Sequence, residues 1–220
     1  MIVDERIITF INSLDTKNSE ILEDIEREAL ADNVPIIRRE MQSFLKVLLM
    51  VKKPMRVLEV GTAVGFSALL MSEYVPEECA ITTIENYEKR IPIARQNFVR
   101  AGKEKKITLL EGDAMDVLKT LEGPYDFIFM DAAKGQYIHY LPEILRLLAK
   151  GGILVSDNVM QDGDVIESRF AVERRDRTIH ARMREYLYEL KHNDALVTSI
   201  LRHRHAQARR RGIRMIPSFK

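Results

Sequence analysis

The alternation of short apolar runs with amphipathic stretches constrains the fold of this chain more than any other feature. Apolar runs recur at residues 56–60, 80–84, 107–110, 125–130 and 152–155. Stretches with helical spacing of apolar residues separate them, at about 66–75, 87–101, 114–121 and 138–149. Strands that alternate with helices are typical of βαβ units, which pair in parallel through right-handed crossovers. The sequence therefore predicts an α/β fold with a mostly parallel sheet flanked by helices.

The 220 residues, 46% of them apolar, are enough for one sizeable domain. Residues 1–51 have helical spacing at 3–14, 18–31 and 40–51, and we expect these helices to cover a ligand pocket. The core is predicted over residues 55–201. It includes a long charged helix at 171–192 and a final strand at 195–201. Residues 202–220 form an atypical basic tail.

Composition excludes several classes of protein. The formal net charge is +1, so no global field indicates a nucleic-acid-binding protein. Cys79 is the only cysteine, which excludes intramolecular disulfides and cysteine zinc sites and favours a reducing compartment. No apolar segment approaches the ~20 residues that span a bilayer, and the first residues do not read as a secretory signal. We therefore expect a cytoplasmic protein with no membrane partner.

Polar and glycine residues at successive strand ends predict a nucleoside site. Gly61 and Gly65 follow the first strand in a GxxxG spacing. The GxGxxG of dinucleotide-binding enzymes is missing, which argues against a nicotinamide-dependent oxidoreductase. Glu85 ends the second strand, where a carboxylate can accept hydrogen bonds from ribose hydroxyls, and Asp113-Ala114 follow the third, where adenine can be read. A purely structural turn is the alternative for the glycines taken alone.

A second group of residues predicts a metal site. Asp131 follows the run 125–130, and Asp157-Asn158 follow the run 152–155. Adjacent parallel strands deliver their carboxyl ends to one edge of the sheet, so these oxygen ligands should converge on Mg²⁺. Lys134 is a candidate base beside them. Taken singly, Asp157-Asn158 could be a turn and Lys134 a surface lysine.

Five motifs together resemble a known family: LEVGTAVGFSA, TIE, EGDA, DAAKGQY and SDNV. They resemble the class I S-adenosylmethionine-dependent, metal-dependent O-methyltransferases of the catechol and caffeoyl-CoA type, over about residues 33–160. The stretch at 34–36 and the arginine-containing helix most resemble the bacterial branch, which methylates 5-hydroxyuridine at the tRNA wobble position. The resemblance implies a Rossmann-like fold with a seven-stranded sheet, a homodimer, and Mg²⁺ or Mn²⁺ as the metal.

The same resemblance implies roles for individual residues. The methyl donor would be bound by Met41, Glu59, Gly61, Ser67, Glu85, Asp113, Ala114 and Asp131. The metal would be held by Asp131, Asp157 and Asn158. Lys134 and Asp131 would be the catalytic residues. A divalent ion in such a site lowers the pKa of a hydroxyl that it coordinates.

The acceptor is harder to predict, because a catechol and a 5-hydroxyuracil both offer two vicinal oxygens to a metal. Arginine forks suit phosphates, and six follow the metal motif: Arg169, Arg174, Arg175, Arg177, Arg182 and Arg184. We therefore assign Arg174 and Arg175 to a tRNA anticodon stem-loop, and Tyr137 or, as the alternative, Phe170 to stacking on a splayed base. A solvated helix face and an aromatic side chain packed in the core are the alternatives.

The predicted function is therefore conversion of 5-hydroxyuridine in tRNA to 5-methoxyuridine. The alternative is the same chemistry on a small catechol-like or caffeoyl-CoA-like phenol. A non-enzymatic, donor-binding RNA module or scaffold is a third interpretation, which the complete set of metal and base residues argues against.

The end of the chain departs from the family pattern. Family members usually close with a strand, a Gly-Asp-Gly turn and a last apolar strand, whereas this chain is rich in arginine and histidine from residue 202. Residues 213–219 are a second candidate for the last strand. An RNA-binding arm and a shifted reading frame are the other interpretations of this tail.

Overall fold

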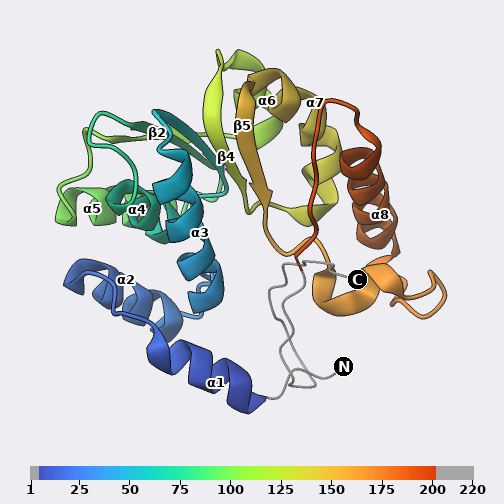
Figure 1. The fold of residues 1–220 in the computed structure, drawn as a ribbon, viewed down its shortest axis with the longest axis horizontal. Helices are drawn as coiled ribbons and strands as arrows, with labels where there is room; N and C mark the ends of the chain where they lie inside the picture. The colour runs from blue at the N-terminus through green and yellow to red at the C-terminus, as the bar shows by residue number, and fades with distance from the viewer. Residues whose placement is uncertain (1–4, 202–220) are drawn as a thin grey trace.

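A computed structural model describes residues 5–201 of the chain (Figure 1). In this part of the chain five parallel strands form one sheet with the order β3-β2-β1-β4-β5. The strands are β1 (Arg56–Val60), β2 (Ala80–Glu85), β3 (Ile107–Glu111), β4 (Tyr125–Met130) and β5 (Leu148–Ser156). The predicted parallel α/β sheet is confirmed. The strand order reverses direction at β1, which is where open α/β sheets bind their ligands.

Helices cover both faces of the sheet. In chain order they are α1 (Glu5–Leu14), α2 (Glu20–Ala31), α3 (Arg39–Lys52), α4 (Phe66–Glu73), α5 (Ile91–Arg100), α6 (Ala114–Thr120), α7 (Tyr137–Leu147) and α8 (Arg177–His192). Two short 3₁₀ helices, η1 (Lys134–Gln136) and η2 (Gln161–Ile166), lie in the loops after β4 and β5. Figure 1 shows α3, α4 and α5 on one side of the strands and α6, α7 and α8 on the other.

Two hydrophobic cores lie on the two faces of the sheet. Val57 and Phe127 belong to the core shared with α2 to α5, whereas their neighbours Leu58 and Ile128 belong to the core shared with α6 to α8. All four side chains have no exposed surface. Successive residues of a strand point to opposite faces, so apolar residues at consecutive positions fill both cores.

The seven-stranded sheet that the resemblance implied is not what residues 5–201 form, because five strands are present there. Residues 195–201, predicted as a strand, form none. Thr198 is instead hydrogen-bonded to α8: its carbonyl accepts from Lys191 Nζ at 2.7 Å, and its hydroxyl donates to the Leu190 carbonyl at 2.6 Å. The second candidate strand, 213–219, and the basic tail 202–220 lie outside the described residues.

The three predicted N-terminal helices are present, but their predicted position as a cover over the pocket is not confirmed. Both α2 and α3 contact α4, on one face of the sheet. The predicted charged helix at 171–192 is shorter than expected, because α8 begins at Arg177. No helix among residues 5–201 is long and apolar enough to cross a membrane.

Hydrogen bonds of the sheet continue one residue past the strand ends. The N–H groups of Gly61, Asp131 and Asp157 donate to carbonyls of the neighbouring strands at 3.1, 2.9 and 2.9 Å. Val60 is in register with Ile84 and Met130, and Met130 with Ser156. The next residues therefore lie in one row along the edge of the sheet: Glu85, Gly61, Asp131 and Asp157.

Gly61 is required in this row by close backbone approach. Its φ is +104°, and a Cβ atom there would lie 2.2 Å from the Asp131 carbonyl oxygen. An unfavourable backbone conformation alone costs about 1–3 kcal/mol. We expect Gly61→Ala to lower the free energy of unfolding by more than this amount, because the clash with the Asp131 carbonyl adds to the backbone cost. Urea unfolding followed by circular dichroism measures the loss.

Gly102→Ala is the matched control for Gly61→Ala. Gly102 also has a positive φ, +62°, but nothing lies within 4 Å of a Cβ placed there. The control should lose only about 1–2 kcal/mol from its left-handed backbone. Equal losses in the two variants would contradict the steric argument.

Candidate active site

A cavity of about 350 Å³ lies at the carboxyl ends of the strands. It is lined by the loop between α2 and α3, the glycine turn after β1 and the residues that follow β2, β3, β4 and β5. Of the predicted site residues, those that line it are Gly61, Ser67, Glu85, Ala114, Asp131, Lys134 and Asn158. The other predicted site residues lie outside this lining: Met41, Glu59, Asp113, Tyr137, Asp157, Arg174 and Arg175.

Backbone N–H groups hold the Glu85 carboxylate in a fixed orientation. Oε2 accepts from Ala63 N at 2.7 Å, and Oε1 accepts from Asn86 N at 3.0 Å and from Tyr87 N at 2.8 Å. A carboxylate has about four acceptor positions. Glu85 therefore has capacity left for a hydrogen bond from a bound hydroxyl.

The glycine turn is anchored to α5. A Cβ on Gly65 would lie 2.6 Å from the Phe98 ring, so the turn packs tightly against this helix. Asn97 Nδ2 donates to the Val64 carbonyl at 2.9 Å, and Asn97 is 2% exposed. The sequence interpretation missed Asn97. A polar residue on the apolar face of the 87–101 stretch was the signal that could have revealed it.

Asp113 and Met41 do not line the cavity, and their predicted contacts with the donor stay predictions. Asp113 caps α6, where its Oδ1 accepts from Met115 N at 2.8 Å, while the neighbouring Ala114 lines the cavity. Met41 is 4% exposed and packs in the core beside α2 and α4. Packing in the core explains why Met41 does not line the cavity.

Glu59 lies beneath the cavity, fully buried in β1. The Thr83 hydroxyl donates to its Oε2, while its Oε1 has no partner. Burial raises the pKa of Glu59 to about 7, against the hydrogen bonds from Ser67 and Thr83, which lower it. Glu59 is linked to the cavity lining through Ser67 and, by way of the Thr83 hydroxyl, through Thr62.

The carboxylate edge of the cavity contains Asp131, Lys134, Asp157 and Asn158. Lys134 Nζ lies 3.9 Å from Asp131 Oδ1, and the two side chains are 24% and 31% exposed. Asp157 has no exposed surface. Its Oδ1 accepts from Asn158 N at 2.7 Å, whereas its Oδ2 and Asn158 Oδ1 are buried without a partner. Asn158 has a φ of +56°, a conformation that asparagine tolerates better than most residues.

Burial makes the charged forms of the aspartates at this edge unfavourable unless a cation is nearby. Burial and the neighbouring Asp131 raise the pKa of Asp157 to about 7, while the positive charges of Lys134 and Arg38 lower it. Burial also raises the pKa of Asp131, and Lys134 opposes this. Arg38 and the adjoining loop 35–37 were not predicted as site residues. The Val34-Pro35 break between two apolar helices was the available signal.

The predicted stacking role of Tyr137 is wrong in this structure, which agrees with the alternative of packing in the core. Tyr137 has no exposed surface. Its hydroxyl donates to the carbonyls of Met130 at 3.0 Å and Asp157 at 3.3 Å, and its ring packs edge-on against Tyr186. Tyr137 therefore supports the ends of β4 and β5 from below.

The arginines after the metal motif divide into two groups. Arg177, Arg182 and Arg184 donate to the backbone carbonyls of Val172, Gly135 and Val165, so they hold loops in place. Arg169, Arg174 and Arg175 are exposed, and Arg175 forms ion pairs with Glu173 and Asp176. The predicted contact of Arg174 and Arg175 with an anticodon stem-loop stays a prediction.

Comparison of the sequence with models of protein families identifies the family of this chain. The model of a family described as O-methyltransferase matches residues 12–202. The chain belongs to this O-methyltransferase family. The matched residues include the five parallel strands and the residues that line the cavity.

The chain is similar to O-methyltransferases from bacteria, plants and fungi. A catechol O-methyltransferase from Niastella koreensis is 35% identical over 128 residues, 56% of this chain and 58% of that protein. Caffeoyl-CoA O-methyltransferase 2 from Populus trichocarpa is 35% identical over 133 residues, 56% of this chain and 52% of that protein. The matches thus span little more than half of these relatives. The SAH-bound methyltransferase structure from Podospora anserina is 27% identical, covers 86% of both chains and has a TM-score of 0.78.

The carboxylate edge fits a divalent cation. Among residues 5–201 no group of three His, Cys, Asp or Glu side chains could hold a metal, and the predicted set has only two carboxylates plus an amide. Its chemistry nevertheless suits Mg²⁺, which prefers oxygen ligands and keeps several waters. The unpartnered Oδ2 of Asp157 and Oδ1 of Asn158 are the observation that supports this, because buried acceptors need a partner.

Thermal unfolding with and without Mg²⁺ tests the metal site. We expect Mg²⁺ to stabilise the unmodified chain, by about 2.7 kcal/mol at a concentration 100-fold above its Kd. Asp157→Asn should be at least as stable without metal, because repulsion from Asp131 is removed, and should respond less to Mg²⁺. Asp116→Asn, on the surface of α6, is the matched control and should respond like the unmodified chain. An undiminished response of Asp157→Asn would contradict the assignment.

The raised pKa of Glu59 predicts a pH dependence of stability. Between its ordinary value of 4.5 and about 7, the folded chain holds a proton on Glu59 that the unfolded chain has lost. Stability from this group is therefore fully present below 4.5 and falls as the pH rises to about 7. Glu59→Gln removes this dependence.

Urea unfolding of the unmodified chain and of Glu59→Gln across this pH window measures the effect. The stability of Glu59→Gln relative to the unmodified chain should rise from pH ~5 to pH ~8. A difference that is constant with pH would contradict the assignment of a raised pKa to Glu59.

Proposed function

We propose that this protein is an S-adenosylmethionine-dependent O-methyltransferase that acts on a catechol-like phenol and uses a divalent metal. One observation carries the proposal. Glu85, Gly61, Asp131 and Asp157 form one row along the sheet edge beside the cavity. This row supports a site in which Glu85 would accept hydrogen bonds from hydroxyls, Gly61 would allow close approach and the two aspartates would hold a cation. The names of the catechol and caffeoyl-CoA O-methyltransferase relatives support the same chemistry.

Residues at the ends of β1, β2 and β3 would bind the methyl donor. Glu85 would bind the ribose hydroxyls of the donor, because its carboxylate is oriented by three backbone N–H groups and retains an acceptor position. Gly61 would let the donor approach the backbone of the turn. The small residue Ala114 leaves room beside the Asp113-capped start of α6 for a flat ring.

The acceptor hydroxyl would lie at the carboxylate edge. Asp131, Asp157 and Asn158 would hold the cation, which when bound supplies the charge that lowers the pKa of a phenolic hydroxyl. Lys134 lines the cavity and, as the neutral amine, would take the proton of that hydroxyl at Nζ and become the ammonium. The rigid sheet edge would align the oxygen with the donor methyl group, and alignment alone can contribute much of the rate.

The contacts of the arginines and of Tyr137 favour a small phenol over tRNA as the acceptor. Three of the six arginines that suggested a phosphate-binding surface donate to backbone carbonyls, and Tyr137 is buried. Methylation of tRNA 5-hydroxyuridine and a homodimer stay predictions from the sequence resemblance.

Transfer of a labelled methyl group from S-adenosylmethionine tests the proposal. We expect Mg²⁺-dependent transfer to catechol or caffeoyl-CoA. Lys134→Ala should lower kcat by about 10²–10⁴-fold, as loss of a general base does. Lys119→Ala, an exposed lysine on α6, is the matched control and should retain activity.

Each of three outcomes would contradict a part of the proposal. Transfer only to tRNA that contains 5-hydroxyuridine would overturn the acceptor and restore the interpretation from the sequence. Absence of transfer to any of these acceptors would overturn the reaction itself. Full activity of Lys134→Ala would remove Lys134 from the role of base.

A further inference from the structure

One wall of the cavity has no secondary structure of its own. Residues 35–37, between α2 and α3, line the cavity and belong to neither a helix nor a strand. The next residue, Arg38, carries a positive charge that acts on Asp157, so this wall adjoins the carboxylate edge. Its position is fixed partly by Ile37, whose side chain is 2% exposed in the core, and partly by side chains that hydrogen-bond to its backbone.

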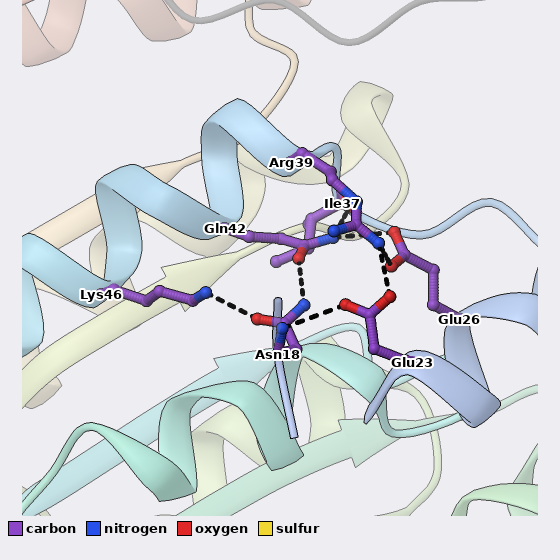
Figure 2. A network of polar contacts seen from close by, with 7 residues as sticks. All are labelled: Asn18, Glu23, Glu26, Ile37, Arg39, Gln42 and Lys46. Atoms are coloured by element: carbon purple, nitrogen blue, oxygen red, sulfur yellow. Dashed lines mark hydrogen bonds and ion pairs between the residues drawn. The ribbon is translucent and has the colours of Figure 1, made fainter. Parts of the chain in front are cut away.

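The buried amide of Gln42 grips this wall. Gln42 lies in the first turns of α3 and is 2% exposed, although it does not line the cavity. Its Nε2 donates to the Ile37 carbonyl at 3.0 Å and to Glu26 Oε1 at 3.2 Å. Its Oε1 accepts from Asn18 Nδ2 at 2.8 Å. Figure 2 shows the amide between these three partners.

Charged neighbours fix which way this amide points. Arg39 Nη2 donates to Glu26 Oε2 at 2.6 Å and to Glu23 Oε2 at 2.9 Å, which holds Glu26 as an acceptor beside Gln42 (Figure 2). Lys46 Nζ donates to Asn18 Oδ1 at 2.6 Å, which turns the Asn18 amide group toward Gln42. A reversed Gln42 would direct its oxygen at the Glu26 carboxylate and the Ile37 carbonyl. The network therefore favours one arrangement.

We propose that Gln42 is a positioning residue for ligand binding: its bond to the Ile37 carbonyl holds the wall 35–37 in the conformation that receives the methyl donor. This inference rests on the proposed function for the identity of the ligand. Of the three hydrogen bonds of Gln42, only the one to the Ile37 carbonyl reaches the wall, because the other two lead to α2 and to the segment before α2. Its loss should weaken donor binding.

Asn18 offers a matched control for a merely structural role. Asn18→Ala removes one partner of Gln42 and the partner of Lys46, but leaves the bond from Gln42 to the Ile37 carbonyl. Gln42→Leu removes all three bonds at similar side-chain volume. Gln42→Glu keeps an acceptor for Asn18 but places a carboxylate against Glu26 and the Ile37 carbonyl, and serves if Gln42→Leu does not fold.

The experiment measures the affinity of S-adenosylhomocysteine for each variant by titration calorimetry, below the melting temperature of each. The donor KM in the labelled-methyl assay is a second measurement. We expect Gln42→Leu to weaken binding about tenfold, the effect of one lost buried hydrogen bond. Asn18→Ala should stay within about twofold of the unmodified chain even if it melts as early as Gln42→Leu.

Three outcomes would overturn the inference. If the unmodified chain binds S-adenosylhomocysteine and both Gln42 variants bind it equally well, the inference alone fails. If Asn18→Ala weakens binding as much as Gln42→Leu, the network acts through general stability and the specific role of Gln42 fails. If the unmodified chain does not bind S-adenosylhomocysteine, the proposed function and the inference fail together.

Discussion

The hydrogen bonds that continue past the strand ends are the interaction on which the site depends. Gly61, Asp131 and Asp157 each donate their N–H to a carbonyl of a neighbouring strand, one residue beyond Val60, Met130 and Ser156. Parallel register thereby turns residues that are far apart in the sequence into direct neighbours. The close approach of Gly61 to the Asp131 carbonyl leaves no room for a side chain between them.

The site concentrates unfavourable groups on this rigid base. Glu59 and Asp157 are fully buried carboxyl groups, and Asp157 Oδ2 and Asn158 Oδ1 lack partners. Such groups lower stability unless a ligand compensates for them. The two hydrophobic cores and the fully buried Tyr137 below the strand ends hold them in place. The packing around these carboxyl groups therefore keeps them oriented despite their cost in stability.

Two loops line the cavity, and a buried side-chain amide from a neighbouring helix contributes a hydrogen bond to each. Asn97 on α5 donates to the Val64 carbonyl in the glycine turn. Gln42 on α3 donates to the Ile37 carbonyl in the loop between α2 and α3. Both amides are 2% exposed. Irregular segments have no hydrogen-bond ladder of their own, so a buried side chain from a neighbouring helix supplies the missing bond.

The sequence alone determined the parallel α/β fold, the N-terminal helices and the convergence of Gly61, Glu85, Asp131 and Asn158 at one edge. The spacing of apolar residues in strands and helices and the residues after each strand are local signals. Parallel pairing of the strands then brings those residues together at one edge of the sheet. Only the tertiary structure decided that Tyr137 is buried, that 195–201 bonds to α8, and that Gln42 and Asn97 hold the loops. These outcomes depend on which side chain fills a space or meets a carbonyl from a distant segment, and no local pattern encodes such a pairing.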